Sequence, residues 1–234
     1  MPVTALVLAA GRGLRLGGRV AKPLVLINSK PILMYSLETF QKHRDIDNII
    51  VVVSEALRDE VDALIKRYRI RKVTRIVPGG LRRQDSVLNG LRALQQKNGM
   101  VLIHDSARPF IDSRTISAVI KEALVCGAAI AAVAVKSTIK EVFVSSGKAL
   151  IRKTLDRGRL WEAQTPQVFK QELLMKACKK FALSQVTDDA MFVEKLGVRV
   201  RLVPGSYSNI KVTTPEDIIV AQALARNRRK IRGI

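Results

Sequence analysis

The sequence contains few of the residues that indicate a disulfide scaffold, a metal site or a membrane span. It has only 2 cysteines among 234 residues, Cys126 and Cys178. Both lie in segments of helix periodicity without metal or redox spacing, so we expect core thiols from a reducing compartment. The longest apolar run, Val125–Val135, has 11 residues, whereas a bilayer span needs about 20. No basic region precedes the first apolar residues, which argues against a signal peptide. We therefore expect a cytoplasmic protein without a membrane partner.

Acidic and aromatic residues are also scarce. The chain has 20 Asp and Glu against 41 Lys and Arg, a net charge of +21, and 4% aromatic residues. Such a charge attracts anions: nucleic acid, acidic membranes or phosphorylated small molecules. The basic stretches Arg67–Arg75 and Asn227–Ile234 could follow a phosphate backbone. The scarcity of aromatic residues and the lack of a recognisable nucleic-acid module argue against such a partner. A basic RNA-binding protein therefore stays only as the alternative function outside the enzymes.

Apolar runs of strand length alternate with segments of helix periodicity. The expected strands are Val3–Ala9, Asn48–Val53, Val73–Val77, Met100–His104 and Ile130–Val135. The expected helices between them are Pro31–His43, Leu57–Tyr68, Gln84–Gln95 and Ser113–Cys126. This order predicts an α/β, Rossmann-like fold, in which helices cover both faces of a mostly parallel sheet. Ligands of such sheets bind beyond the carboxyl ends of the strands, here after Ala9, Val77 and His104.

The second half of the chain departs from this alternation. Residues from about 136 to 163 alternate polar and apolar side chains around Ser145-Ser146-Gly147, which predicts a projecting β-arm. Beyond it we expect helices near Lys170–Phe181 and Asp189–Leu196, a strand at Val198–Val203, and a helix from Pro215 to about Arg226. A basic tail at about 226–234 completes a single domain of residues 1–234.

The loop after the first strand, Leu8–Leu24, combines glycines with four cations. It fails the dinucleotide fingerprint because Leu16 stands where a glycine is needed, and it fails the Walker A pattern because Arg19 and Val20 follow Gly18. A glycine turn with Arg15 and Lys22 nearby still offers backbone N–H groups and positive charge to a polyphosphate.

This loop resembles the signature of nucleotidyltransferases, and four further segments follow it in order: Gly79–Leu91, Val101–Phe110, Thr165–Phe169 and Asn209–Asp217. Together they resemble the 2-C-methyl-D-erythritol 4-phosphate cytidylyltransferase family of the non-mevalonate isoprenoid pathway. The resemblance implies transfer of CMP from CTP to 2-C-methyl-D-erythritol 4-phosphate, which gives CDP-methylerythritol and pyrophosphate. A ribitol 5-phosphate cytidylyltransferase, which shares the loop, is the alternative within the enzyme class.

The resemblance also implies roles for individual residues. The expected catalytic residues are Arg15, Lys22, Arg157 and Lys211. The expected nucleotide-binding residues are Ala9, Ala10, Gly11, Gly79, Gly80, Ser86, Asp105 and Ser106. The polyol phosphate is expected at Asp105, Arg108, Thr138, Arg157, Thr165 and Lys211. Members of that family commonly have an acid where this sequence has Leu81. They also commonly have a proline before the lysine, whereas here Pro23 follows Lys22.

Two further expectations concern a metal and a second copy of the chain. Asp105 follows a buried strand at the sheet edge, and a lone carboxylate there suits Mg²⁺ or another divalent cation. The alternative for Asp105 is a turn aspartate paired with Arg108. The arm cannot bury both of its faces on its own domain, and isolated hairpins are marginally stable. We therefore expect a homodimer formed through the arm, with Arg157 acting across the dimer.

Overall fold

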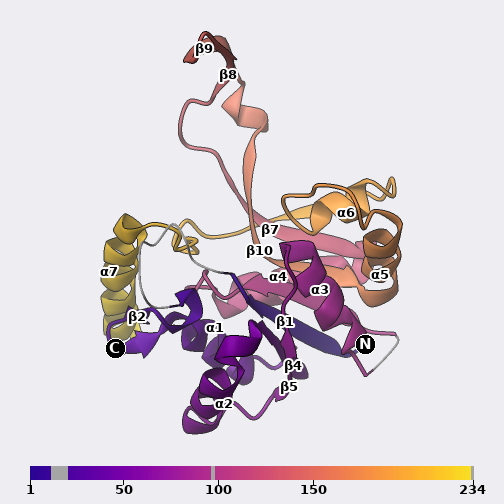
Figure 1. Cartoon of the computed structure of the whole chain (residues 1–234), viewed down its shortest axis with the longest axis vertical. Helices are drawn as coiled ribbons and strands as arrows, with labels where there is room; N and C mark the ends of the chain where they lie inside the picture. Colours follow the sequence, from indigo (N-terminus) through magenta and orange to yellow (C-terminus); the bar gives the residue numbers. More distant parts are fainter. Residues whose placement is uncertain (12–20, 96–97, 233–234) are drawn as a thin grey trace.

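The fold is built on one large central sheet, whose strand order determines which strand ends lie side by side. The computed structural model describes residues 1–11, 21–95 and 98–232. Within these ranges, a seven-stranded sheet has the order β11-β7-β10-β6-β1-β4-β5 (Figure 1). Its strands are β1 (Val3–Ala9), β4 (Asn48–Val53), β5 (Val73–Pro78), β6 (Met100–Asp105), β7 (Ala128–Ala134), β10 (Trp161–Lys170) and β11 (Arg201–Pro204). β1 pairs in parallel with β4 and β6, as do β4 with β5 and β7 with β11, which confirms the mostly parallel sheet.

β10 is the strand that sequence reasoning missed. It runs antiparallel between β6 and β7, where the analysis expected the end of the arm and no sheet strand. Gln164, Thr165 and Gln167 are buried within it. Buried polar side chains weaken the apolar signal of a central strand, and Pro166 cannot donate to a ladder, so the pattern hid this strand.

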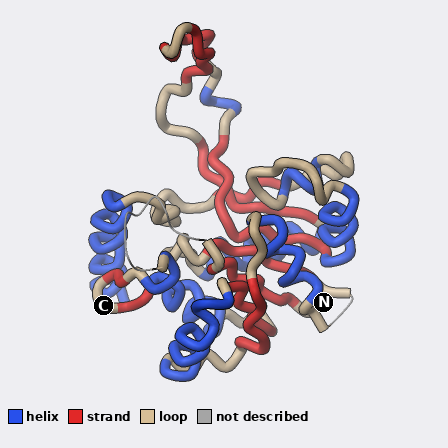
Figure 2. The backbone as a smooth tube through the Cα atoms, in the orientation of Figure 1, coloured by secondary structure: helices blue, strands red, loops and turns tan. Residues whose placement is uncertain are grey.

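Helices cover both faces of the sheet, as expected (Figure 2). Alternate residues of β1 point to opposite faces. Ala5 and Val7 pack in one core cluster with side chains of α1 (Ile32–Lys42), α2 (Arg58–Arg67) and α4 (Ser113–Cys126). Leu6 packs in a second cluster with α3 (Arg83–Arg92), α5 (Gln171–Lys180) and α6 (Ala190–Glu194). The four helices expected in the first half are therefore all present within a few residues of the expected bounds.

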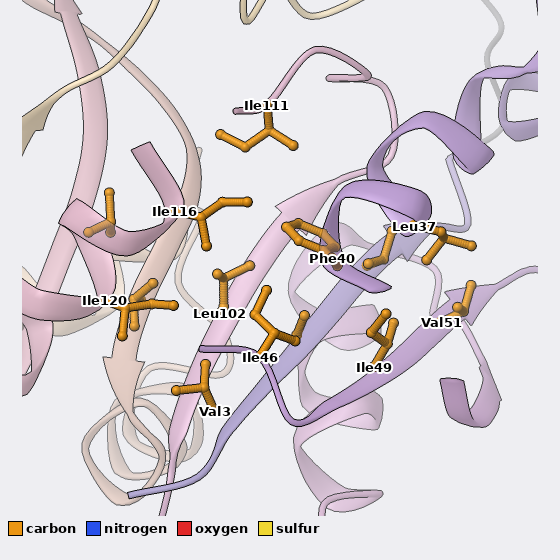
Figure 3. Close-up of a cluster of buried hydrophobic side chains, with 14 of the residues drawn as sticks. Val3, Leu37, Phe40, Ile46, Ile49, Val51, Leu102, Ile111, Ile116 and Ile120 are labelled. Atoms are coloured by element: carbon orange, nitrogen blue, oxygen red, sulfur yellow. The ribbon is translucent and has the colours of Figure 1, made fainter. Parts of the chain in front are cut away.

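The first core cluster is built mainly from aliphatic side chains. Phe40 of α1 lies above Leu102 of β6, and Ile116 and Ile120 of α4 extend the cluster to the side (Figure 3). Burying one such side chain contributes roughly 1.5–3 kcal/mol. Asp112 begins α4 because its carboxylate accepts a hydrogen bond from Thr115 N at 2.8 Å. The helix ends at Gly127, whose φ of 85° suits glycine.

The arm is a hairpin of β8 (Lys140–Ser145) and β9 (Lys148–Thr154) that extends away from the body (Figures 1 and 2). Ser146 and Gly147 both have positive φ, 49° and 74°, as a two-residue type I′ turn requires. The hairpin expected around this turn is therefore present. Its apolar side chains are exposed in the single chain: Val142, Phe143, Val144, Leu150 and Ile151.

The C-terminal segment differs from the expectation. The helix α7 runs from Pro215 to Arg232 instead of ending near Arg226, so most of the predicted basic tail continues the helix. β2 (Leu26–Ile27) pairs with β3 (Lys30–Pro31), and Ile27 packs with Ala221 and Ala225 of α7 in a third, smaller cluster. A helix with an apolar face packed in this way does not stop where charge begins, because long basic side chains have good helix propensity.

Both cysteines are free thiols, but only one belongs to the core. Cys178 is buried in the second cluster, and burial raises the pKa of its thiol to about 12. Cys126 is half-buried at the end of α4, against the expectation of a core thiol. Among the described residues, no helix combines the length and the hydropathy that a membrane span requires.

Candidate active site

A cavity of about 560 Å³ lies at the carboxyl ends of β1, β4, β5 and β6. It is lined by segments that directly follow these strands: Ala9–Gly11, Ser54 and Glu55, Gly79–Arg83, and Asp105–Ala107. Lys22, Ser86 of α3 and Lys211 also line it. The cavity therefore lies at the sheet edge where the strand pattern predicts a ligand.

The glycine pair after β5 allows the backbone to come close to its neighbours. A Cβ atom on Gly79 would overlap the side chain of Ala10 and would lie 3.2 Å from Ser86 Oγ. A Cβ atom on Gly80 would overlap the side chain of Asp85. The Gly80 N–H donates to Ser86 Oγ at 3.0 Å. The expected nucleotide-binding residues Ala10, Gly79, Gly80 and Ser86 thus lie together in the lining of the cavity.

Asp105 brings a buried carboxylate to the lining of the cavity. Its residue is only 8% exposed. Lys211 Nζ lies 2.6 Å from Oδ2, and Arg83 Nη2 lies 3.3 Å from Oδ1. Burial by itself raises the pKa of this carboxyl, but the positive charges of Arg83 and Lys211 outweigh burial and hold the pKa well below its usual range. Both carboxylate oxygens of Asp105 are therefore paired. Their partners are Lys211 and Arg83, whereas the alternative considered from the sequence was Arg108.

Two buried side chains, those of Thr165 and His104, form hydrogen bonds that hold the backbone around Asp105. Thr165 Oγ1 accepts a hydrogen bond from Asp105 N at 3.1 Å and lies 3.0 Å from His104 Nδ1. His104 Nε2 lies 3.0 Å from the carbonyl oxygen of Arg108, which can only accept. Nε2 therefore carries the proton, and Nδ1 accepts from the Thr165 hydroxyl. His104 is fully buried, and burial lowers its pKa to about 4, so the imidazole is neutral near neutral pH.

Arg108 and Thr165 lie beside the cavity and do not line it. Arg108 Nη1 donates to Asn209 O at 2.8 Å, and Nη2 donates to Ala163 O at 3.2 Å. Burial lowers the pKa of this guanidinium. The hydroxyl of Thr165 and both terminal nitrogens of Arg108 contact protein groups in this chain. The expected contact of these two residues with the polyol phosphate therefore stays a prediction.

The remaining predicted residues fall into three groups. Ala9, Gly11, Lys22 and Ser106 line the cavity with the residues described above. Thr138 and Arg157 are exposed at the base of the arm and do not line the cavity of their own chain. Arg157 Nη1 donates to Lys136 O at 2.7 Å. Arg15 lies outside the described residues.

The pair formed by Arg83 and Asp189 was not predicted from the sequence. Arg83 Nη1 lies 2.8 Å from Asp189 Oδ2, and Asp189 is 0% exposed. Burial raises the pKa of the Asp189 carboxyl, while Arg83 opposes this rise by pairing with the charged form. Burial lowers the pKa of Arg83, but the two carboxylates outweigh it and raise the pKa above its usual range. Arg83 could have been singled out because it follows the glycine pair, and Asp189 because it precedes a helix. No local sequence pattern indicates that the two side chains contact each other.

The cavity has the chemistry of a polyanion site. Its described cations are Lys22, Arg82, Arg83 and Lys211, and its acids are Glu55 and Asp105. Among the described residues, no three His, Cys, Asp or Glu side chains cluster as metal ligands. A divalent cation here would therefore take few protein ligands and most of its coordination from a bound phosphate compound and water.

We predict that the Thr165 hydroxyl stabilises the end of β6. Thr165→Val keeps the shape of the side chain but leaves Asp105 N and His104 Nδ1 without a partner, so the free energy of unfolding in urea should fall by about 1–3 kcal/mol. Thr165→Ser is the matched control, because it retains the hydroxyl and should fall less. Equal stability of the Val and Ser variants would contradict the role of these hydrogen bonds.

Comparisons with known proteins agree on one family. The sequence profile of the 2-C-methyl-D-erythritol 4-phosphate cytidylyltransferase family (IspD) matches residues 3–227. A protein of this name from Dehalococcoides mccartyi is 43% identical over 227 residues, which cover 97% of each chain. One from Syntrophotalea carbinolica is 46% identical over 231 residues, covering 95% of this chain and 96% of the relative.

Solved structures give the same result. The crystal structure of 4-diphosphocytidyl-2C-methyl-D-erythritol synthase from Anaerococcus prevotii superposes with a TM-score of 0.83 at 31% identity and covers 96% of both chains. The 2-C-methyl-D-erythritol 4-phosphate cytidylyltransferase of Thermus thermophilus has a TM-score of 0.77 at 29% identity, covering 97% of this chain and all of that one. Because the profile, the relatives and the structures all span nearly the whole chain, this protein belongs to the 2-C-methyl-D-erythritol 4-phosphate cytidylyltransferase family.

Proposed function

We propose that the cavity transfers CMP from CTP to 2-C-methyl-D-erythritol 4-phosphate, releasing pyrophosphate in a step of isoprenoid precursor biosynthesis. One observation carries this function. A close-packed glycine pair and a carboxylate between two cations line the same cavity, together with Lys22. A nucleoside triphosphate has matching parts, a base that accepts close backbone contact and a polyanion that needs cations. The matched family and the curated relatives give no support to the ribitol or RNA alternatives.

Gly79, Gly80 and Ser86 are suited to the cytosine end of CTP. Backbone groups and one hydroxyl leave room for a pyrimidine and exclude a purine by size. Their hydrogen-bonding groups would distinguish cytosine from uracil, because the two bases exchange a donor for an acceptor at C4. Leu81, at 96% exposed, lines the cavity beside the glycine pair without an acidic group.

The chemistry needs cations more than it needs a base. A phosphate oxygen of the polyol attacks the α-phosphorus of CTP, the bond from that phosphorus to the bridging oxygen breaks, and pyrophosphate leaves with the electron pair. The attacking oxygen is already anionic, so the chain has to position two anions and stabilise the charge that develops between them. Lys22 and Lys211 reach the cavity from two segments far apart in the chain and take this role, together with Arg15.

Asp105 fits a magnesium ion that enters with the nucleotide. It is the carboxylate at the end of β6, it borders the cavity, and the cations around it keep it ionised. Mg²⁺ bound by one or two carboxylates and by phosphate oxygens would neutralise charge on the triphosphate. In the chain itself, Arg83 and Lys211 orient the two carboxylate oxygens. A cytoplasmic location, expected from the free thiols, stays a prediction.

The arm completes the site of a second copy. Its exposed apolar side chains, Val142, Phe143, Val144, Leu150 and Ile151, need a cover that the single chain does not provide. Exchange of arms about a two-fold axis would bury them and would bring each arm to the neighbouring subunit. Thr138 and Arg157, which do not line their own cavity, would then bind the polyol phosphate of the partner's site.

A substrate panel tests the reaction. Pyrophosphate release is measured with each of the four NTPs and with 2-C-methyl-D-erythritol 4-phosphate, ribitol 5-phosphate and other polyol phosphates, in the presence of Mg²⁺. We expect CTP with 2-C-methyl-D-erythritol 4-phosphate to give the highest kcat/KM. Faster release with ribitol 5-phosphate or with UTP would overturn the substrate assignment. RNA binding with a steep salt dependence and no turnover of CTP would overturn the enzymatic function itself.

Mixed dimers test the arm. Lys22→Ala and Arg157→Ala subunits, each inactive alone, are dissociated, mixed and reassociated. If Arg157 acts in the partner's site, each mixed dimer has one intact site and one doubly altered site. Random pairing makes half of the dimers mixed, so activity should return to about a quarter of wild type.

The control mixes Lys22→Ala with Lys211→Ala, two changes that alter the cavity of the same chain. Every site then keeps one altered residue, and activity should not return. Failure of the Lys22→Ala and Arg157→Ala mixture to recover, with dimers present by sedimentation, would show that Arg157 acts within its own chain.

A further inference from the structure

Asp189 is a buried carboxylate to which neither the sequence motifs nor the proposed reaction gives a role. It is 0% exposed, it precedes α6, and its ionic contact is Arg83 Nη1 at 2.8 Å. Neither Oδ1 nor Oδ2 has a hydrogen-bond partner among the described residues, so the contact with Arg83 is an ion pair. Ionised groups buried in this way cost free energy unless they are paired, so a role for the charge is expected.

The backbone around Asp189 is fixed to the centre of the sheet. Gln167 Oε1 accepts hydrogen bonds from Asp189 N at 3.0 Å and from Ala190 N at 3.2 Å. Gln167 is itself buried in β10, opposite Ile103 of β6. Asp189 is thus fixed relative to the strand that ends in Asp105.

Arg83 joins the two carboxylates. One terminal nitrogen faces Asp189, and the other lies 3.3 Å from Asp105 Oδ1. The guanidinium is a planar fork, so holding one nitrogen fixes the direction of the other. Lys211 also pairs with Asp105, but its side chain is half-exposed and comes from a loop. Among the described residues it has no second acidic partner. Among these described cations, Arg83 is the one bound on both sides.

We propose that Asp189 and Arg83 form a positioning pair, in which Asp189 keeps Arg83 on Asp105 when the triphosphate enters the cavity. The proposal rests on the reaction proposed above. An untethered arginine that lines the cavity would be drawn to the phosphates of CTP and would leave Asp105 Oδ1 free to turn. With Asp189 in place, Arg83 stays between the two carboxylates, and the Asp105 carboxylate keeps the orientation that the reaction needs.

A structural role and a positioning role make different predictions for the same variants. Loss of a pair that only stabilises the fold would lower stability and would weaken CTP binding along with turnover. Loss of the tether alone would lower kcat and would leave CTP binding unchanged or tighter, because the released Arg83 can contact the triphosphate. The dissociation constant of CTP therefore separates the two roles.

The experiment uses the full chain with Asp189→Asn, Arg83→Lys and the double variant Arg83→Met/Asp189→Leu. For Asp189→Asn we expect kcat to fall about 10- to 100-fold, with no weakening of CTP binding measured by calorimetry. Arg83→Lys keeps the charge at a partly exposed position but cannot bridge two carboxylates, so its kcat should fall as well. The double variant removes both charges together, and its urea midpoint should recover towards wild type while its kcat stays low.

Wild-type kcat in Asp189→Asn or Arg83→Lys would overturn the proposal, as would recovery of kcat in the double variant along with its stability. Weaker CTP binding together with a lower kcat in Asp189→Asn would also overturn it, because that is the result expected of a pair that only stabilises the fold. Wild-type protein assayed in parallel separates the two proposals. If it turns over CTP and 2-C-methyl-D-erythritol 4-phosphate, only the positioning pair is at stake, and if it does not, the proposed function fails first.

Discussion

A buried, ionised carboxylate at the end of β6 is the interaction on which the site depends. Asp105 can stay charged in a buried position only because Arg83 and Lys211 pair with its two oxygens. Those cations come from distant parts of the chain, from the start of α3 and from the loop before α7. β1 and β4 separate β6 from β5 in the sheet, and Arg83, which follows β5, reaches across this edge to Asp105 while Lys211 reaches it from a loop. Fold and charge balance therefore support each other.

The antiparallel strand β10 gives this site much of its precision. It supplies Thr165, which holds the backbone of Asp105, and Gln167, which holds the backbone of Asp189. It also continues from the arm, so the same strand leads from the hairpin to the residues that hold the backbone of Asp105. The polar residues that make β10 a poor strand by pattern are the ones that carry these hydrogen bonds. Local preference and function conflict here, and tertiary hydrogen bonds determine the outcome.

This conflict explains how far the sequence could lead. β1, β4 and α4 have the bounds that periodicity predicts, because their apolar residues face a packed core with regular spacing. The glycine pair and Asp105 were found because each lies at the end of an expected strand in a recognisable motif. Arg83 and Asp189 were missed as a pair because no local pattern connects residues so far apart in the chain. The length of α7 was underestimated because a run of basic residues looks like a tail when its packing is unknown.

Calorimetric titration of CTP into wild type and Asp105→Asn, with and without Mg²⁺, tests most directly whether this carboxylate organises the triphosphate and its cation. Without a divalent cation, Asp105→Asn should bind CTP at least as tightly as wild type, since the substitution removes a charge that repels phosphate. Added Mg²⁺ should strengthen CTP binding to wild type much more than binding to the variant, because a neutral amide is a poorer ligand for this ion. An equal gain from Mg²⁺ in both proteins would contradict the account.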